Sequence, residues 1–130
     1  MSYVYVGTRN ANNTETVINE VFVSSTEAGV LSQMIPFALK VVTDFVEDNI
    51  DEVENVVRVL YGEHREDDDY RKKVKLLEKL NVDEMMESLS SKEILTIYSN
   101  LYKEEEIILV EGYDKDGKPE RLIVDNQFED

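Results

Sequence analysis

Strand-forming residues gather at the two ends of this chain, and this arrangement restricts the folds that it can adopt. Residues 3–6 and 21–23 near the N-terminus are β-branched or aromatic, and residues 107–110 and 122–124 repeat the pattern near the C-terminus. Residues 7–16, rich in turn formers, are expected to be a loop. The sequence therefore predicts an α+β fold whose N-terminal strands and C-terminal β-hairpin can join in one antiparallel sheet. Candidate packing positions on the strands are Tyr3, Tyr5, Val21, Val23, Ile108, Val110 and Ile123.

Apolar residues at helical spacing fill the middle of the chain and predict four to five helices there. The first is expected to begin at Ser25 or Thr26, whose hydroxyl groups suit an N-cap. Because proline lacks an N–H, we expect this helix to stop and restart at Pro36. The next helix is expected to begin with Asp51 as its cap and to end at Gly62, which suits a left-handed exit.

Three more helical patterns follow towards the C-terminal hairpin. Residues 82–89 suit a short helix, and Ser90 and Glu93 have the spacing of a capping box at the start of a longer one. The apolar stripe that precedes them consists of Tyr70, Val74, Leu77 and Leu80.

The size of the chain suits one compact domain that spans residues 1–130, with residues 126–130 expected to fray. Hydrophobic residues make up 42% of the sequence, enough for a core. The N-terminus has no basic region followed by an apolar run, so it does not look like a signal peptide. No uninterrupted apolar stretch approaches the roughly 18 residues of a membrane span. We therefore expect a cytoplasmic protein, in the host cytoplasm if it is viral, with no membrane partner.

Charge is the feature of composition that bears most on function. There are 29 acidic and 14 basic residues, a formal net charge of −15. Such an excess disfavours direct binding to nucleic acid, because the phosphates are also negative and their binders usually bring basic surface. The same field attracts a basic protein.

Catalytic and cofactor chemistry find little support in the residue types. The chain has no cysteine and one histidine, His64, and it lacks a glycine-rich phosphate loop. His64 lies among carboxylates, which favour its protonated form and make it a poor base. We therefore expect no enzyme activity, no cofactor and no metal. The run 112–123 also fails as a calcium loop, because glycine and isoleucine occupy its first and last ligand positions.

The most acidic short segment is residues 62–70, with the sequence GEHREDDDY. Its donors are consecutive, so they point in different directions, whereas a metal site needs donors that converge. Aspartates 67–69 can instead cap the next helix and oppose its dipole, with Lys72 and Lys73 as ionic partners one turn on. A charged contact surface is the functional alternative.

From residue 68 to 125 the expected order is helix, short helix, longer helix and β-hairpin, and residues 89–112 (LSSKEILTIYSNLYKEEEIILVEG) run from the third helix into the hairpin. This order resembles a winged helix-turn-helix module. The resemblance implies a third helix that enters the major groove and presents Lys92, Thr96, Asn100 and Lys103. The hairpin is flanked by carboxylates, which would repel phosphates, so docking to a protein is the alternative. A generic α+β domain with a terminal hairpin fits the same order.

These observations lead to three hypotheses about function. The first is a non-catalytic acidic protein, a phage-type inhibitor or accessory factor, that docks on a basic protein. A nucleic-acid-binding protein is one such partner, and DNA mimicry is one way to bind it. The second is a winged-helix transcription regulator, and the third is a viral or multi-subunit assembly factor that packs against copies of itself. The candidate partner-binding residues for the first are Glu47, Asp48, Asp51, Glu52, Glu54, Glu63, Glu66, Asp67, Asp68 and Asp69.

Overall fold

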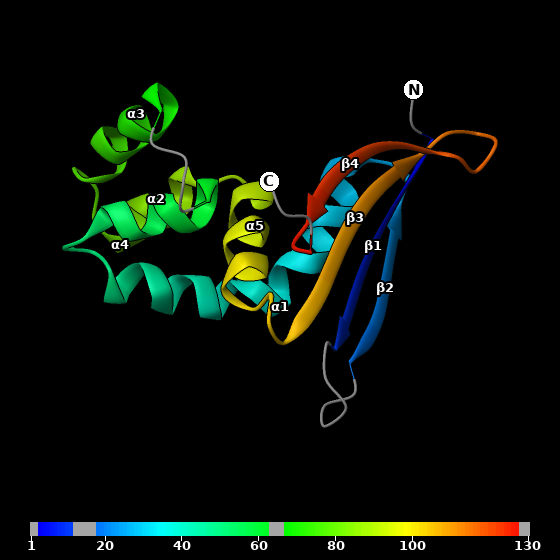
Figure 1. Cartoon of the computed structure of the whole chain (residues 1–130), viewed down its shortest axis with the longest axis horizontal. Helices are drawn as coiled ribbons and strands as arrows, with labels where there is room; N and C mark the ends of the chain where they lie inside the picture. The colour runs from blue at the N-terminus through cyan, green and yellow to red at the C-terminus, as the bar shows by residue number, and fades with distance from the viewer. Residues whose placement is uncertain (1–2, 12–17, 63–66, 128–130) are drawn as a thin grey trace.

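The computed structural model describes residues 3–11, 18–62 and 67–127, and Figure 1 shows the arrangement of their helices and strands. Five helices lie between two pairs of strands in the described part of the chain. In chain order the elements are β1 (Val4–Ala11), β2 (Asn19–Ser24), α1 (Glu27–Asp48), α2 (Val53–Tyr61), α3 (Asp68–Leu77), α4 (Val82–Ser88), α5 (Ser91–Leu101), β3 (Glu106–Tyr113) and β4 (Pro119–Asp125).

The four strands form one antiparallel sheet in the order β2-β1-β3-β4. The predicted α+β fold is therefore confirmed, and the strands from the two ends of the chain meet where β1 pairs with β3. Strand β1 is longer than expected, since residues 7–11 continue it instead of forming a loop. These residues have weak strand propensity, but β1 is a central strand whose backbone is paired on both sides, and this pairing outweighs the propensity.

Helices cover one face of the sheet and extend beyond it (Figure 1). Helices α1 and α5 pack against each other, α1 on β1 and β2, and α5 on β3 and β4. Helices α2, α3 and α4 gather at the end of α1 and α5 away from the strands (Figure 1). The buried apolar residues of all these elements form one cluster.

Helix α1 runs without a break through Pro36, so the predicted restart at this residue was wrong. Pro36 lies on the exposed side of the helix, and Met34 and Ala38 on either side of it are fully buried. Burial of these neighbours stabilises the helix on both sides and offsets the one lost hydrogen bond. At the N-terminus, the Gly29 N–H donates to Thr26 Oγ1 at 3.0 Å, which confirms Thr26 as the cap.

By length and composition α1 is also long and apolar enough to cross a membrane. The expectation that no segment approaches such a span was therefore wrong by this measure. The helix is a weak indication of a membrane protein, because core helices meet the same criterion. Here it supplies the core with Val30, Leu31, Met34, Ala38, Val42 and Val46.

The other helix ends follow local sequence signals with one exception. Ser90 and Glu93 form the predicted capping box of α5, and Gly62 ends α2 with a φ of 94°. The exception is Asp51, since the N-cap of α2 is Glu52, which makes no side-chain capping bond. The Asn49 and Glu52 backbones form a tight turn before α2, which shifts the start of the helix by one residue.

Four of the predicted strand packing positions are buried and three are not. Tyr5, Ile108, Val110 and Ile123 lie in the core, whereas Tyr3, Val21 and Val23 are 55%, 64% and 53% exposed. The register explains the error for the two valines, because they lie opposite Thr8 and Val6, which point away from the helices. Tyr3 precedes the first paired residue of β1, beyond the cover of the helices.

The expected fraying of residues 126–130 does not hold for Asn126, which is only 7% exposed. Its Oδ1 accepts from the Ile108 N–H at 3.0 Å. Its Nδ2 donates to the carbonyls of Ser99 and Glu106, each at 2.9 Å. One side chain thus joins the C-terminal segment to α5 and β3. Residues 128–130 lie outside the described residues.

Candidate partner-binding surface

Helix α2 separates an apolar face from a polar one, and this separation creates the candidate site. Val53, Val56, Val57 and Leu60 are buried against the rest of the molecule. With 3.6 residues per turn, the side chains at 52, 54, 55 and 58 are directed to other sides of the helix. Helix α3 packs beside α2, and a cleft lies between them.

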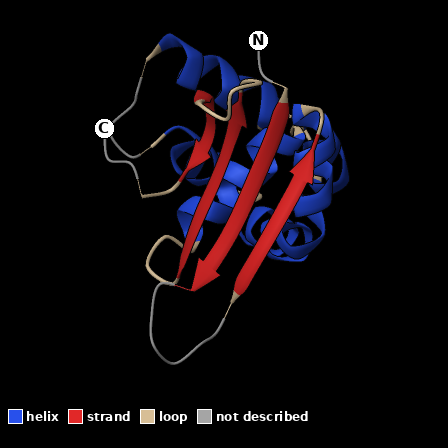
Figure 2. Cartoon of the chain, turned by 90° about the vertical axis from the view of Figure 1, so that its right-hand side faces the viewer, coloured by secondary structure: helices blue, strands red, loops and turns tan. Residues whose placement is uncertain are grey.

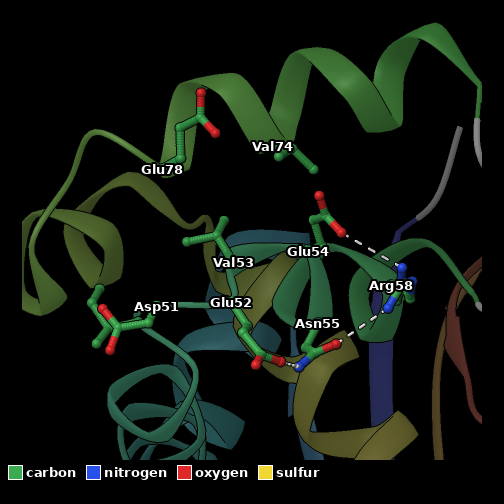
Figure 3. Close-up of a pocket in the computed structure, with 9 residues that line it drawn as sticks. Asp51, Glu52, Val53, Glu54, Asn55, Arg58, Val74 and Glu78 are labelled. Carbon is green, nitrogen blue, oxygen red and sulfur yellow. Dashed lines mark hydrogen bonds and ion pairs between the residues drawn. The ribbon is translucent and has the colours of Figure 1, made fainter.

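The cleft has a volume of about 520 Å³ and is open to solvent (Figure 3). Val53 and Val74 lie between the two helices, and Glu78 lies at the end of α3, on the rim of the cleft (Figure 3). We call this surface the acidic cleft. Its lining residues are Ile50, Asp51, Glu52, Val53, Glu54, Asn55, Arg58, Val74 and Glu78.

Four carboxylates and one cation line the acidic cleft, and the cation already has partners. Arg58 Nη2 lies 3.6 Å from Glu54 Oε2, and Arg58 Nη1 donates to Asn55 Oδ1 at 3.3 Å (Figure 3). Asn55 Nδ2 in turn donates to Glu52 Oε2 at 3.0 Å. Arg58 is the one cation among the lining residues, so the lining offers no second cation to Asp51 or Glu78. The cleft is therefore negative, and it has acceptors for the donor groups of a ligand.

The structure divides the acidic residues predicted from the sequence into two groups. Asp51, Glu52 and Glu54 line the cleft, and Glu47 and Asp48 lie exposed at the end of α1, a few residues before it. Asp67, Asp68 and Asp69 lie at the start of α3, at the opposite end of that helix from Glu78. Glu63 and Glu66 lie outside the described residues, as does His64.

The aspartates at the start of α3 have the local roles that their positions predict. The Tyr70 N–H donates to Asp67 Oδ1 at 3.1 Å, so Asp67 is the N-cap. Asp68 pairs with Arg71 at 3.2 Å. Lys73 instead pairs with Glu93 of α5 at 2.8 Å, so its predicted partner was wrong. Its side chain is largely buried, because this side of α3 turns towards the core.

Glu78 belongs to the cleft but was missed, because it lies in a locally basic segment, residues 71–79. The signal that could have identified it is helical spacing. Glu78 follows Val74 by four residues, so it lies on the side of α3 that carries the apolar stripe towards α2.

A second polar cluster, also missed, lies between the sheet and α5. Arg9 Nε donates to Glu106, Arg9 Nη1 to Glu20 Oε1 at 2.8 Å, and Arg9 Nη2 to Tyr98 Oη at 3.0 Å. The guanidinium also lies over the Phe37 ring, 4.3 Å from its centroid. Burial and a hydrogen bond donated to Glu106 raise the pKa of Tyr98 well above its usual range. Every polar group here is paired, and the contacts join β1, β2, β3 and α5, so the cluster has a structural role.

Helix α5 lies at the centre of the molecule and packs on α1, α2 and both C-terminal strands. Of the residues that the winged-helix resemblance would present to DNA, Lys92 and Lys103 are exposed. Thr96 is half-buried, and Asn100 Nδ2 donates to the Val59 carbonyl at 2.7 Å. In the part of the chain that the structure describes, the arrangement of helices and sheet contains nothing specific to a winged helix.

Within the described residues, no group of three or more His, Asp or Glu side chains could hold a metal ion. In the β3–β4 turn, Asp114 Oδ1 accepts from the Asp116 and Lys118 N–H groups, at 2.9 and 3.0 Å. These geometries define an α+β domain with an acidic cleft between two helices. No family model, curated protein or solved structure matches the chain.

Proposed function

We propose that this protein is a non-catalytic binding protein that docks an acidic surface on a basic protein partner. The acidic cleft would be the centre of this surface, extended by Glu47, Asp48 and the aspartates at 67–69. The observation that carries the proposal is the set of four carboxylates around one cleft whose single arginine is already paired. The net charge of −15 adds a long-range field that speeds encounter with a cation.

A nucleic-acid-binding protein is the class of partner that this surface suits best. Such proteins carry arginines and lysines arranged for phosphate oxygens, and carboxylates offer similar charge and acceptors. By occupying those side chains, the protein would compete with DNA. This mode of action is that of a phage-type inhibitor or accessory factor working in the cytoplasm.

The proposal is tested by calorimetric titration against a panel of basic DNA-binding proteins. The test variant is Asp51→Asn with Glu78→Gln, because neither change removes a bond that holds the fold together. Loss of two exposed charge pairs should weaken binding about three- to tenfold. Binding of the parent protein should also fall with added salt and compete with duplex DNA.

The matched control is Glu105→Gln with Asp116→Asn, which removes the same charge from exposed positions at the sheet end of the molecule. It should bind within about twofold of the parent protein, since screening limits distant charges. Equal weakening by both variants would mean that net charge, rather than the cleft, drives binding. Affinity that does not depend on salt would contradict the proposal altogether.

The winged-helix regulator and the assembly factor stay predictions, because no particular contact favours either. A gel-shift assay at low salt tests the first, since retardation of a duplex would require a phosphate-binding surface. Light scattering tests the second, because an assembly factor that packs on its own copies would exceed the mass of a monomer.

A further inference from the structure

The sheet has a second face, directed away from the helices, that carries exposed apolar side chains. Figure 2 looks onto this face, with the strands in front and the helices behind them. On β3, burial alternates residue by residue, and the less buried set points to this side. Residues opposite each other in the register share a face. The open sheet face therefore consists of Val4, Val6, Thr8, Asn10, Asn19, Val21, Val23, Ile107, Leu109, Glu111, Tyr113, Pro119, Leu122 and Asp125.

Several large apolar side chains of this face are exposed to solvent. Val21, Val23 and Leu122 are 64%, 53% and 55% exposed, and they account for half of the exposed large hydrophobic residues among the described residues. They lie on the two edge strands, with further apolar residues on β1 and β3 between them. A contiguous apolar patch on a soluble surface is typical of a contact site.

One carboxylate lies in the middle of the open sheet face. Glu111 is on a central strand, with Val6 opposite it on β1 and Leu122 opposite it on β4. Tyr113 Oη donates to Glu111 Oε2 at 2.5 Å, and within the described residues Glu111 Oε1 can still accept a hydrogen bond. The other charged residue of the face, Asp125, is at its border and accepts from the Gln127 N–H at 3.0 Å. The face therefore carries one carboxylate at its centre, Glu111, among apolar side chains, and a second carboxylate, Asp125, only at its border.

This charge argues against a second copy of the chain as the occupant. If two open sheet faces packed about a two-fold axis, both Glu111 carboxylates would approach the axis. Two like charges in a dry interface are strongly unfavourable. The net charge of −15 on each copy would oppose the contact further. An anionic lipid surface is disfavoured for the same reason.

We propose that the open sheet face binds an amphipathic helix of a partner protein, whose apolar side surrounds one arginine or lysine that pairs with Glu111. The inner face already packs helices, and a helix on the outer face would complete a three-layer arrangement. Addition of a strand to the β2 edge is less suited, because Gln33 Nε2 already donates to the Val23 carbonyl at 2.9 Å. The inference goes beyond the acidic cleft and does not depend on it.

A synthetic helical peptide of about 14 residues tests this inference, because about 20 Å of helix spans four strands spaced by about 4.8 Å. The peptide has leucines around one central arginine on one side and neutral polar residues on the other. A second peptide replaces the arginine with glutamate. Binding is followed by the backbone NMR signals of the full chain, which should shift mainly in β1 and β3.

Glu111→Gln should weaken binding of the arginine peptide at least about tenfold, because it leaves the buried cation without its partner. Glu87→Gln, an exposed charge change on α4, is the matched control and should leave the affinity within about twofold. Val21→Thr with Leu122→Thr should also weaken binding, through lost apolar contact. The glutamate peptide should not bind.

Several results would overturn the inference. These are equal binding of both peptides, no effect of Glu111→Gln, or NMR shifts confined to α2 and α3. In the last case the peptide would bind in the acidic cleft, and the variant Asp51→Asn with Glu78→Gln would weaken that binding. This outcome would leave the proposed function of the cleft standing. A stable dimer in which the side-chain NMR signals of the open sheet face shift with protein concentration would identify a second copy as the occupant instead.

Discussion

Asn126 shows how much one side chain can contribute when all its hydrogen-bonding groups are used in the core. It is buried, and its amide bonds to backbone groups of Ile108, Ser99 and Glu106. Ile108 and Glu106 belong to β3, and Ser99 belongs to α5. Removal of the amide would leave buried backbone donors and acceptors without partners, and such groups are costly to leave unpaired.

We therefore expect Asn126→Ala to lower the free energy of unfolding by about 2–4 kcal/mol. Urea denaturation followed by circular dichroism measures this change. Gln127→Ala, at the exposed neighbouring position, is the control and should cost less than about 1 kcal/mol. If Asn126→Ala left the free energy of unfolding unchanged, the C-terminal segment would not hold β3 and α5 together.

Glu93 links a helix cap to an ion pair between helices. Burial of Glu93 acts to raise its pKa, but hydrogen bonds from Lys73 and from the Ser90 backbone outweigh this effect and lower the pKa below its ordinary value of 4.5. A carboxyl whose pKa is lower in the folded state stabilises the fold above its unfolded pKa. That contribution is lost as the pH falls through the folded pKa.

Glu93→Gln should preserve the capping geometry, since glutamine can also close the box, but it removes the charge that pairs with Lys73. We expect the parent protein to be more stable by about 1 kcal/mol at neutral pH. The two stability curves should converge as the pH falls below 4.5, the ordinary pKa of Glu93. Chemical denaturation across this pH range makes the measurement, and a constant difference at all pH values would contradict the assignment.

At the scale of the elements, α1 organises the molecule because it contacts strands, α2, α4 and α5. Its N-terminal half packs on the sheet, where Gly7 has room for no side chain. A Cβ on Gly7 would lie 2.3 Å from Met34 Sδ. Strand β1 and α1 therefore pack closely, and the helix keeps its direction through Pro36 to reach the helices beyond the sheet (Figure 1).

Pro36→Ala should stabilise the protein, because Pro36 is exposed and no core contact is lost when alanine replaces it. Alanine restores one backbone hydrogen bond and is the best helix former, so we expect a gain of about 1–2 kcal/mol. Thermal denaturation is the measurement. Leu39→Ala, at an exposed position one turn further on, is the control and should change stability little. A loss of stability in Pro36→Ala would show that the fold needs a bend at this residue.

The whole molecule has two different surfaces at its two ends. The helical end carries the acidic cleft, and the sheet end carries an apolar face with one central carboxylate. Acidic side chains outnumber basic ones by 15, so repulsion between like charges lowers the stability of the folded state. Mobile ions screen this repulsion, since the Debye length shortens from about 30 Å to about 8 Å between 0.01 M and 0.15 M salt.

Moderate salt should therefore stabilise the free protein while it weakens binding to a basic partner. A gain of about 1 kcal/mol would raise the midpoint of thermal unfolding by roughly 4 °C for a chain of this size. A variant that combines the four neutral substitutions at Asp51, Glu78, Glu105 and Asp116 should respond less, because its net charge is closer to zero. An equal response in both proteins would show that the salt effect has another origin.

The amino-acid sequence by itself determined the order of the strands and helices and where most helices begin. Thr26, Asp67 and the pair Ser90 and Glu93 act through hydrogen bonds that span three residues, so the local sequence contains the whole signal. The Asp-Gly turn before β4 is local in the same way, with a positive φ at Gly117. The acidic residues at 51, 52 and 54 could be proposed as a site because they are close in sequence.

Only the tertiary structure decided which residues meet across the chain. The pair Arg9 and Glu106 is separated by 97 positions, and Asn126 joins groups 18 to 27 residues away. Val21 and Val23 look like core residues until the register of β2 against β1 directs them to the outer face. Glu78 joins the acidic cleft because α3 packs beside α2. These outcomes depend on the order and register of elements, which arise from burial across the whole molecule and leave no local pattern.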